Sequence, residues 1–425
     1  MNYFSVKSKE KAYDSILGFF FKSSGPYYII YLMMFFVFSL NVIPRNIPII
    51  MACLVFLVAP LEITSYLYIF SLPWMYVSYI FGGLTLSLVQ SIIFIIKIAL
   101  FKKRIKMSLF DIIMTFFLAF CGAVHLITYH SFTGISFVFY FFIACFFHSQ
   151  ICNDYKEKSL FLKNALFAIL CSDFVAIVYG FFNNTNVNRW IRGLGYTAQL
   201  YGTMGTTRFG MYLCIALLFP LFFIEEKRIK IILSAILSIC VLLTVSMTSI
   251  LILLFIYLYY FFFFQKPGLR SIKILIYLIA IIALVVIFWN SISEISFVKP
   301  IVYRFNYVVD QYNMGNINAA TTGRVDLGNT YLKRFESASF FEKMFGSSNI
   351  SVEGEKFSHN SFIDMLNYFG IIGIALTLFL QVKRLSIYFK TQYFKHILLL
   401  KIIILVSAIS VSIFSAQFWQ IWLFI

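Results

Sequence analysis

The chain has 425 residues, of which 61% are hydrophobic and 12% carry a charged side chain. Soluble domains carry about 25% charged residues, so this composition excludes a soluble globular protein and predicts a polytopic membrane protein. The net charge of +17 does not indicate a nucleic-acid partner, because the basic residues cluster beside apolar runs, as in the cytoplasmic loops of membrane proteins.

Apolar runs recur along the whole chain, and a spanning helix needs about 20 apolar residues. The runs that reach or approach this length are 27–43, 108–127, 131–150, 160–182, 209–224, 229–246, 247–264, 272–289, 360–380 and 396–415. The region 47–100 can hold two full helices or three short ones, with Pro60 and Pro73 as breaks. The predicted fold is therefore an all-α polytopic membrane protein with about 12 transmembrane helices.

The basic loops predict the orientation of these helices. Lysine and arginine gather at 101–106, 153–158, 225–230, 266–273 and 381–390, which places these loops in the cytoplasm together with the lysine-rich N-terminus. An even number of crossings before residue 101 then favours three short segments within 47–100. The opposite side receives the loops 183–208 and 290–359.

Three parts follow from this pattern. We expect an N-terminal transmembrane bundle at 1–289, which includes the outer loop 183–208. A large outer loop at 290–359 precedes the third- or second-last helix, and C-terminal transmembrane helices occupy 360–425. The stretch 323–337 has a helix-like pattern, so we expect the large loop to fold over the membrane face.

The outer loops carry arginines whose guanidinium groups offer a fork of donors suited to phosphate oxygens. The first loop or its edge holds Arg189, Arg192 and Arg208, and the second holds Arg304, Arg324 and Arg334. Several arginines near a membrane face could bind a lipid-linked diphosphate. Contact with lipid headgroups, or with loop carboxylates such as Asp326, would explain any single one of them as well.

His359 closes the large outer loop and is followed by a polar helix face. Asn360, Asp364 and Asn367 recur at the spacing i, i+4 and i+7, which places them on one side of a helix. Polar groups at membrane depth must be paired or line a water-filled cavity. They therefore either bond neighbouring helices or line a substrate cavity. His125 lies within an apolar run, where a packed structural role is the simpler interpretation.

Several motifs are absent from the sequence. It contains no Asp-x-Asp, no GxxxxGK[ST], no GxGxxG and, among its seven cysteines, no CxxC pair. We therefore expect no metal site and no cofactor, and ATP or dinucleotide chemistry is not predicted. A substrate that is already activated on a lipid would need neither.

His359-Asn360, nine residues, and then Gly370-Ile-Ile-Gly373 resembles the HN-x9-GxxG signature of the O-antigen ligase and polysaccharide polymerase superfamily (Wzy/WaaL-like). TTGR at 321–324 and MFGSS at 344–348 are similar to the Gly-Arg pair and the later Phe-Gly turn of that family's large loop. The segment 192–217 looks like its earlier arginine- and glycine-containing stretch. The resemblance covers roughly 190–380 and is greatest to Wzy polysaccharide polymerases.

The resemblance implies a GT-C-like glycosyltransferase of the bacterial cytoplasmic (inner) membrane, with its active site facing the periplasm or the cell exterior. Donor and acceptor would be undecaprenyl-diphosphate-linked glycans, joined into O-antigen or capsular polysaccharide with inversion and without metal. A chain-length regulator protein and the lipid bilayer are further implied partners, and nucleic acid is not. By family likeness His359 would be the general base, Arg324 with Arg192 or Arg208 would bind the diphosphate, and Asn360, Asp364 and Asn367 would line the substrate cavity.

Two other functions stay open at this point. The first is an O-antigen ligase that transfers the glycan to lipid A-core. A polymerase is favoured because 206–210 reads TTRFG where the family often shows Pro-Asn, and 244–250 reads TVSMTSI where many members show Ser-Arg. The second is a polysaccharide flippase or other transporter, which should show inverted repeats; the sequence shows no such symmetry.

Overall fold

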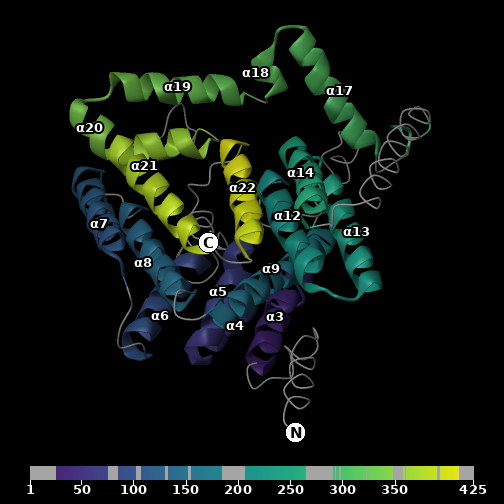
Figure 1. The fold of residues 1–425 in the computed structure, drawn as a ribbon, viewed down its shortest axis with the longest axis horizontal. Helices are drawn as coiled ribbons and strands as arrows, with labels where there is room; N and C mark the ends of the chain where they lie inside the picture. The colour runs from purple at the N-terminus through teal and green to yellow at the C-terminus, as the bar shows by residue number, and fades with distance from the viewer. Residues whose placement is uncertain are drawn as a thin grey trace.

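The computed structural model describes residues 25–74, 85–101, 107–129, 133–151, 155–183, 206–264, 291, 293–295, 298–321, 323–347, 358, 360–389 and 393–410. Every regular element within these ranges is a helix, which confirms the predicted all-α fold class. Figure 1 shows the helices coloured along the chain from purple to yellow.

The N-terminal helices are α3 (Gly25–Leu40), α4 (Asn46–Val58), α5 (Leu61–Ser71), the short 3-10 helix η1 (Leu72–Trp74) and α6 (Leu86–Phe101). Pro60 follows the end of α4, because proline has no N–H with which to continue a helix, and η1 contains Pro73. Within the described residues of 47–100 the structure has the α-helices α4, α5 and α6, in agreement with the alternative of three short segments. The Lys97 Nζ donates to the Phe56 carbonyl at 2.9 Å and so satisfies a backbone group at the end of α4.

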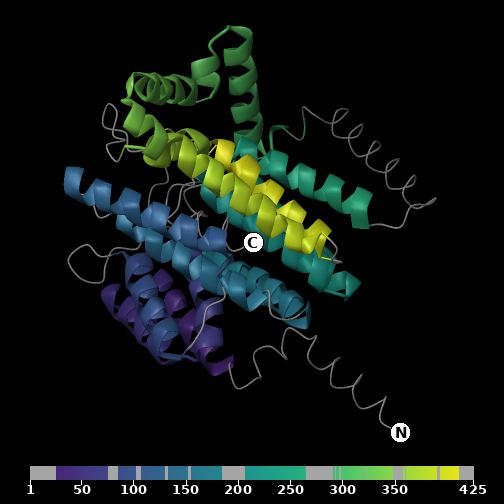
Figure 2. The same cartoon turned by 60° about the vertical axis from the view of Figure 1, so that its left-hand side comes forward.

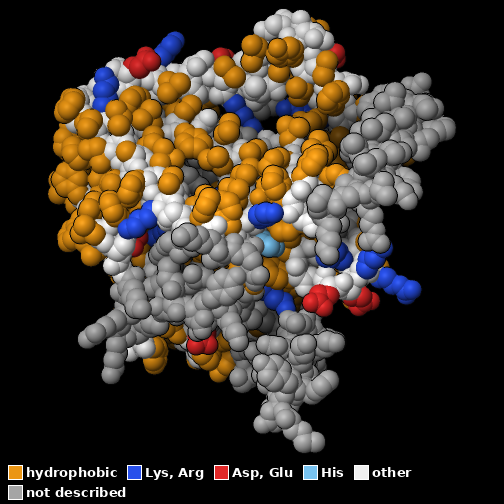
Figure 3. All heavy atoms as spheres, viewed as in Figure 1, with side chains coloured by type: hydrophobic (Ala, Val, Ile, Leu, Met, Phe, Trp, Pro, Cys, Tyr) orange, Lys and Arg blue, Asp and Glu red, His pale blue; other side chains and the backbone are white. Residues whose placement is uncertain are grey.

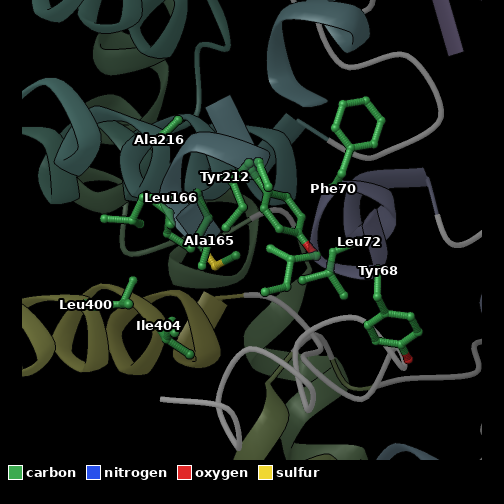
Figure 4. Close-up of a cluster of buried hydrophobic side chains, with 14 of the residues drawn as sticks. Tyr68, Phe70, Leu72, Ala165, Leu166, Tyr212, Ala216, Leu400 and Ile404 are labelled. Carbon is green, nitrogen blue, oxygen red and sulfur yellow. The ribbon is translucent and has the colours of Figure 1, made fainter. Parts of the chain in front are cut away.

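The remaining bundle helices are α7 (Leu109–Tyr129), α8 (Thr133–Ile151), α9 (Tyr155–Asn183), α12 (Thr206–Phe223), α13 (Lys227–Leu243), α14 (Met247–Phe264) and α22 (Phe394–Ser410). Helix α9 packs on α3, α5 and α12, and so it joins the N-terminal helices to the later ones. Figure 4 shows their buried side chains meeting, with Tyr212 of α12 among residues of α5, α9 and α22.

Four helices form a layer that we call the crest. They are α17 (Lys299–Asn313), α18 (Ile317–Ala320), α19 (Arg324–Ser337) and α20 (Phe340–Phe345), and α19 confirms the helix predicted at 323–337. Figures 1 and 2 place the green crest on the far side of α21 from the purple N-terminal helices. A capping box begins α20, because Ser339 Oγ accepts from the Glu342 N–H at 3.2 Å and Glu342 accepts from the Ser339 N–H at 3.0 Å.

Helix α21 (Ser361–Tyr388) bends at Gly370, which has φ +63° and ψ −168°. The apolar run 360–380 therefore lies within one helix, as expected, but the helix changes direction at Gly370, which the sequence did not predict. In Figure 1 the part before Gly370 runs beneath α19, and the part after it descends into the bundle. The polar residues at the start of α21 consequently lie in a layer between the crest and the bundle.

Within the described ranges, four helices are long and apolar enough to cross a membrane, namely Leu109–Thr128, Phe161–Gly180, Met247–Phe264 and Ser361–Ser386. Shorter apolar helices lie at Pro26–Leu40, Asn46–Val58, Leu86–Phe101, Ser136–Phe147 and Thr207–Phe223. Large apolar side chains such as Phe116 and Leu251 are exposed on these helices, an arrangement that monomeric soluble proteins avoid over large areas. The helices are compatible with a membrane protein.

Two buried aspartates within the bundle differ in their partners. Asp111 of α7 accepts from the Arg384 Nη2 of α21 at 3.2 Å, and both side chains are buried. Asp173 of α9 is fully buried, and neither of its carboxylate oxygens has a hydrogen-bond partner among the described residues.

This difference predicts opposite effects of two matched substitutions. Asp111→Asn should lower the free energy of unfolding by about 3–5 kcal/mol, because it leaves the buried Arg384 cation without its carboxylate. Asp173→Asn should be neutral or stabilising, because it replaces a buried carboxyl group that has no hydrogen-bond partner among the described residues. Melting temperatures of the two purified variants in one detergent test this prediction. An equal loss in both variants would contradict it.

Candidate functional site

The polar start of α21 is held together by its own hydrogen bonds. Asn360 is the N-cap, and its Oδ1 accepts from the N–H groups of Phe362 at 3.0 Å and Ile363 at 3.3 Å. Ser358 Oγ accepts from the Asn360 N–H at 3.1 Å and donates to the Asn360 carbonyl at 2.9 Å. Asn360 therefore fixes where the helix begins, which accounts for its residue type.

Asp364 and Asn367, one and two turns further on, are both buried. The Asp364 Oδ1 accepts from the Ser358 N–H at 2.7 Å, so it ties the preceding chain to the helix. The Asn367 Nδ2 donates to the Ile363 carbonyl at 2.9 Å and to the Tyr331 carbonyl of α19 at 3.5 Å. The polar face was expected either to bond neighbouring helices or to line a substrate cavity. The contacts of Asp364 and Asn367 are of the first kind.

The bend of α21 is packed against the end of α20. A Cβ built on Gly346 would lie 2.0 Å from the Tyr368 carbonyl oxygen, and one built on Gly370 would lie 2.4 Å from the Met344 carbonyl group. The Ser347 N–H donates to the Asn367 carbonyl at 2.6 Å. The Phe-Gly turn and the first glycine of GxxG, far apart in the sequence, therefore meet backbone to backbone.

This contact predicts a large effect of Gly346→Ala. Gly346 has φ +87° and ψ +168°, a conformation essentially confined to glycine, and its Cβ would also clash with the Tyr368 backbone. Gly315 is the matched control, because its φ is +72° but nothing lies within 4 Å of an added Cβ. Gly315→Ala should lower the free energy of unfolding by about 1–2 kcal/mol, and Gly346→Ala should lower it further or prevent folding.

Melting temperature and the monodisperse fraction in detergent check this expectation. Equal behaviour of the two alanine variants would show that the clash at Gly346 is relieved without consequence.

Arg324 begins α19, which lies parallel to the first part of α21. A Cβ on Gly328 would lie 3.4 Å from Ile363, and Tyr331 contacts Asn367 one turn later along both helices. One turn before Gly328 is Arg324, so the same register brings Arg324 to the start of α21, near Asn360. Arg324 therefore lies at the end of α19 that is nearer the start of α21.

Arg324 has a second arginine as its neighbour. Burial lowers the pKa of the Arg324 guanidinium below its usual value, and the nearby positive charge of Arg304 lowers this pKa further. Both side chains are half-buried, and the Arg304 guanidinium lies 5.4 Å from the centre of the Tyr307 ring. Figure 3 shows basic side chains within a hollow beneath the crest.

The described part of the chain offers these arginines no carboxylate partner. Its ion pairs are Lys299–Glu294 and Arg384–Asp111, and neither includes Arg304 or Arg324. The alternative in which Arg324 pairs with Asp326 is therefore not seen. Two half-buried cations, close enough for the charge of Arg304 to lower the pKa of Arg324, are suited to an anion with several oxygen atoms.

The other predicted site residues lie elsewhere or outside the described ranges. His359 and Arg192 are outside the described residues. Arg208 is half-buried in the first turn of α12, next to Thr207, whose carbonyl accepts from Ser249 Oγ at 3.5 Å. Helix α12 packs mainly on α9, α13, α14 and α22.

Arg304 is the residue that the sequence interpretation did not single out from the other outer arginines. The sequence feature that could have identified Arg304 is its i, i+3 spacing to Tyr307 on α17. This spacing places a cation and an aromatic ring on the same side of one helix. His125 is buried, as expected, with its ring centre 6.0 Å from that of Tyr368.

Comparisons with protein-family models, with curated proteins and with solved structures found no match to this chain.

Proposed function

We propose that this protein is a membrane glycosyltransferase that joins undecaprenyl-diphosphate-linked oligosaccharide repeat units into O-antigen or capsular polysaccharide. The observation that carries the proposal is the pair of half-buried arginines Arg304 and Arg324 of the crest. A diphosphate offers several anionic oxygens, and guanidinium groups bind such oxygens with parallel hydrogen bonds. The lipid part of the substrate would remain in the membrane while its diphosphate reaches this pair.

In the proposed reaction a hydroxyl of the acceptor sugar attacks C1 of the donor sugar from the face opposite the diphosphate. His359 takes the hydroxyl proton while a new C1–O bond forms and the C1–O bond to the diphosphate breaks. The lipid diphosphate leaves with the bonding electrons. Arg324, with Arg192 or Arg208, offsets the charge that develops on it.

The proposal includes about 12 membrane crossings in a GT-C-like arrangement, in the cytoplasmic membrane of a bacterium. The crest would lie on the periplasmic or outer side. Support comes from the charged turn between α12 and α13, which holds Lys227 and Arg228 at the end of these helices away from the crest. Basic turns of this kind belong in the cytoplasm.

Purified protein incubated with lipid-linked repeat units tests the function. We expect a ladder of longer lipid-linked products, with the same rate in the presence of a metal chelator. Transfer of a single glycan to lipid A-core without a ladder would instead define a ligase. Movement of the lipid across vesicle membranes without a new glycosidic bond would define a transporter. Either result would overturn the polymerase.

A further inference from the structure

Helix α20 exposes two neighbouring phenylalanines in the described structure. Phe340 is 80% exposed and Phe341 is 46% exposed, although both lie in a layer that the sequence assigns to an aqueous loop. Burying a phenylalanine side chain in an apolar environment is more favourable than leaving it in water. Two such residues side by side in a short helix therefore indicate an apolar surrounding.

The position of α20 identifies that surrounding. The Phe120 ring of α7 lies 6.3 Å from the Phe341 ring and 5.4 Å from the Phe345 ring, centre to centre. The Cys121 Sγ donates to the Phe345 carbonyl at 3.4 Å. Helix α20 thus packs on the side of α7 and not on its end.

The side of α7 that carries this contact is an exposed apolar stripe. Phe116, Phe120 and Ile127 are exposed along it, and Ile127, nearer the end of the helix than the α20 contact, is 76% exposed. Figure 3 shows hydrophobic side chains continuing without a break from the end of the crest where α20 lies down over this side of the bundle. The surfaces of α20 and α7 are therefore continuous.

The depth of the contact follows from helix geometry. The apolar span of α7 ends at Thr128, and a helix rises 1.5 Å per residue, so the level of Phe120 lies roughly 12 Å inside that end. A hydrocarbon core is about 30 Å thick. If α7 crosses the bilayer, the Phe341 and Phe345 rings reach the hydrocarbon of one leaflet, and the charged Glu342 and Lys343 of the same short helix limit its depth to one from which their side chains extend to the headgroups.

We propose that α20 dips into the leaflet on the crest side and that Phe340 and Phe341 contact lipid acyl chains. The crest is then anchored in the membrane at the end of α19 that is distant from Arg324. The contact between Gly346 and Gly370 connects this anchor directly to the bend of α21. The anchor depends on α7 spanning the bilayer and not on the chemistry of the site.

A photo-reactive phenylalanine analogue tests the proposal in native membranes. Benzoylphenylalanine replaces Phe340 in one variant and Tyr312 in the control, which is 67% exposed on α17 of the crest and is likewise aromatic. After irradiation, mass spectrometry of the digested protein should find lipid adducts at position 340 and none at position 312. Adducts of position 340 with a second copy of the chain or with another protein, or no adduct at all, would overturn the proposal.

A second pair of variants keeps the test independent of labelling. Phe340→Asp should lower the melting temperature of protein in lipid bicelles, because it places a carboxylate in the hydrocarbon. Tyr312→Asp should leave that melting temperature unchanged, because its side chain meets water. Equal melting temperatures of the two variants would show that Phe340 lies in water.

Discussion

The His359→Ala variant should synthesise polymer about 100- to 10,000-fold more slowly than the wild-type protein, because a general base contributes a rate factor of this size. The substitution removes the only group proposed to accept the proton of the attacking hydroxyl. The rate of ladder formation with lipid-linked repeat units is the measurement, at equal amounts of monodisperse protein.

His125→Phe is the matched control for this variant. His125 is buried against Tyr368, and neither of its ring nitrogens has a hydrogen-bond partner within the described part of the chain. Phenylalanine keeps the ring contact and removes both nitrogens, so we expect near wild-type synthesis. A wild-type rate in His359→Ala would show that His359 is not the general base. A large loss in His125→Phe would instead indicate that His125 of α7 takes part in the reaction.

Arg324→Lys should lower polymer synthesis by more than tenfold, which corresponds to more than about 1.4 kcal/mol of activation free energy. Lysine keeps the positive charge but loses the fork that binds two phosphate oxygens at once. The loss should appear when the rate is measured over a range of lipid-linked substrate concentrations. Arg334→Lys, ten positions later on α19, is the control and should behave as the wild type.

The stability of an Arg324 variant distinguishes a role in substrate binding from a role in holding the crest together. Burial and the charge of Arg304 both disfavour the Arg324 cation, as the direction of its pKa shows. Arg324→Gln should therefore leave the melting temperature of the substrate-free protein unchanged or raise it, while synthesis falls. If Arg324 instead stabilises the crest, melting temperature and activity should fall together, and the diphosphate assignment would be lost.

The helices themselves could be predicted from local features of the sequence. Hydropathy located α7, α9 and α14 to within a few residues, because each of these helices is an apolar segment bounded by polar ones. The pattern at 323–337 predicted α19 within one residue, since its polar and apolar positions alternate with helical spacing. Pro60 and Pro73 marked the breaks among the N-terminal helices.

The bend of α21 could not be predicted in the same way. Hydropathy records how apolar a segment is but not its direction, and Gly370 lies within an apolar run. Its conformation is set by the close approach of Met344, a contact between residues distant in sequence. The influence of the Arg304 charge on the pKa of Arg324 likewise depends on where α17 and α19 lie relative to each other, which no spacing along one helix reveals.

The hydrogen bond between the Ser347 N–H and the Asn367 carbonyl has a consequence for changes in chain length. It attaches the residue after Gly346 directly to the backbone of α21, and Asn367 also donates to the Tyr331 carbonyl of α19. A deletion between Asn360 and Asn367 would therefore shift Asn367 out of register with both Ser347 and Tyr331 and would separate the crest from the bend of α21.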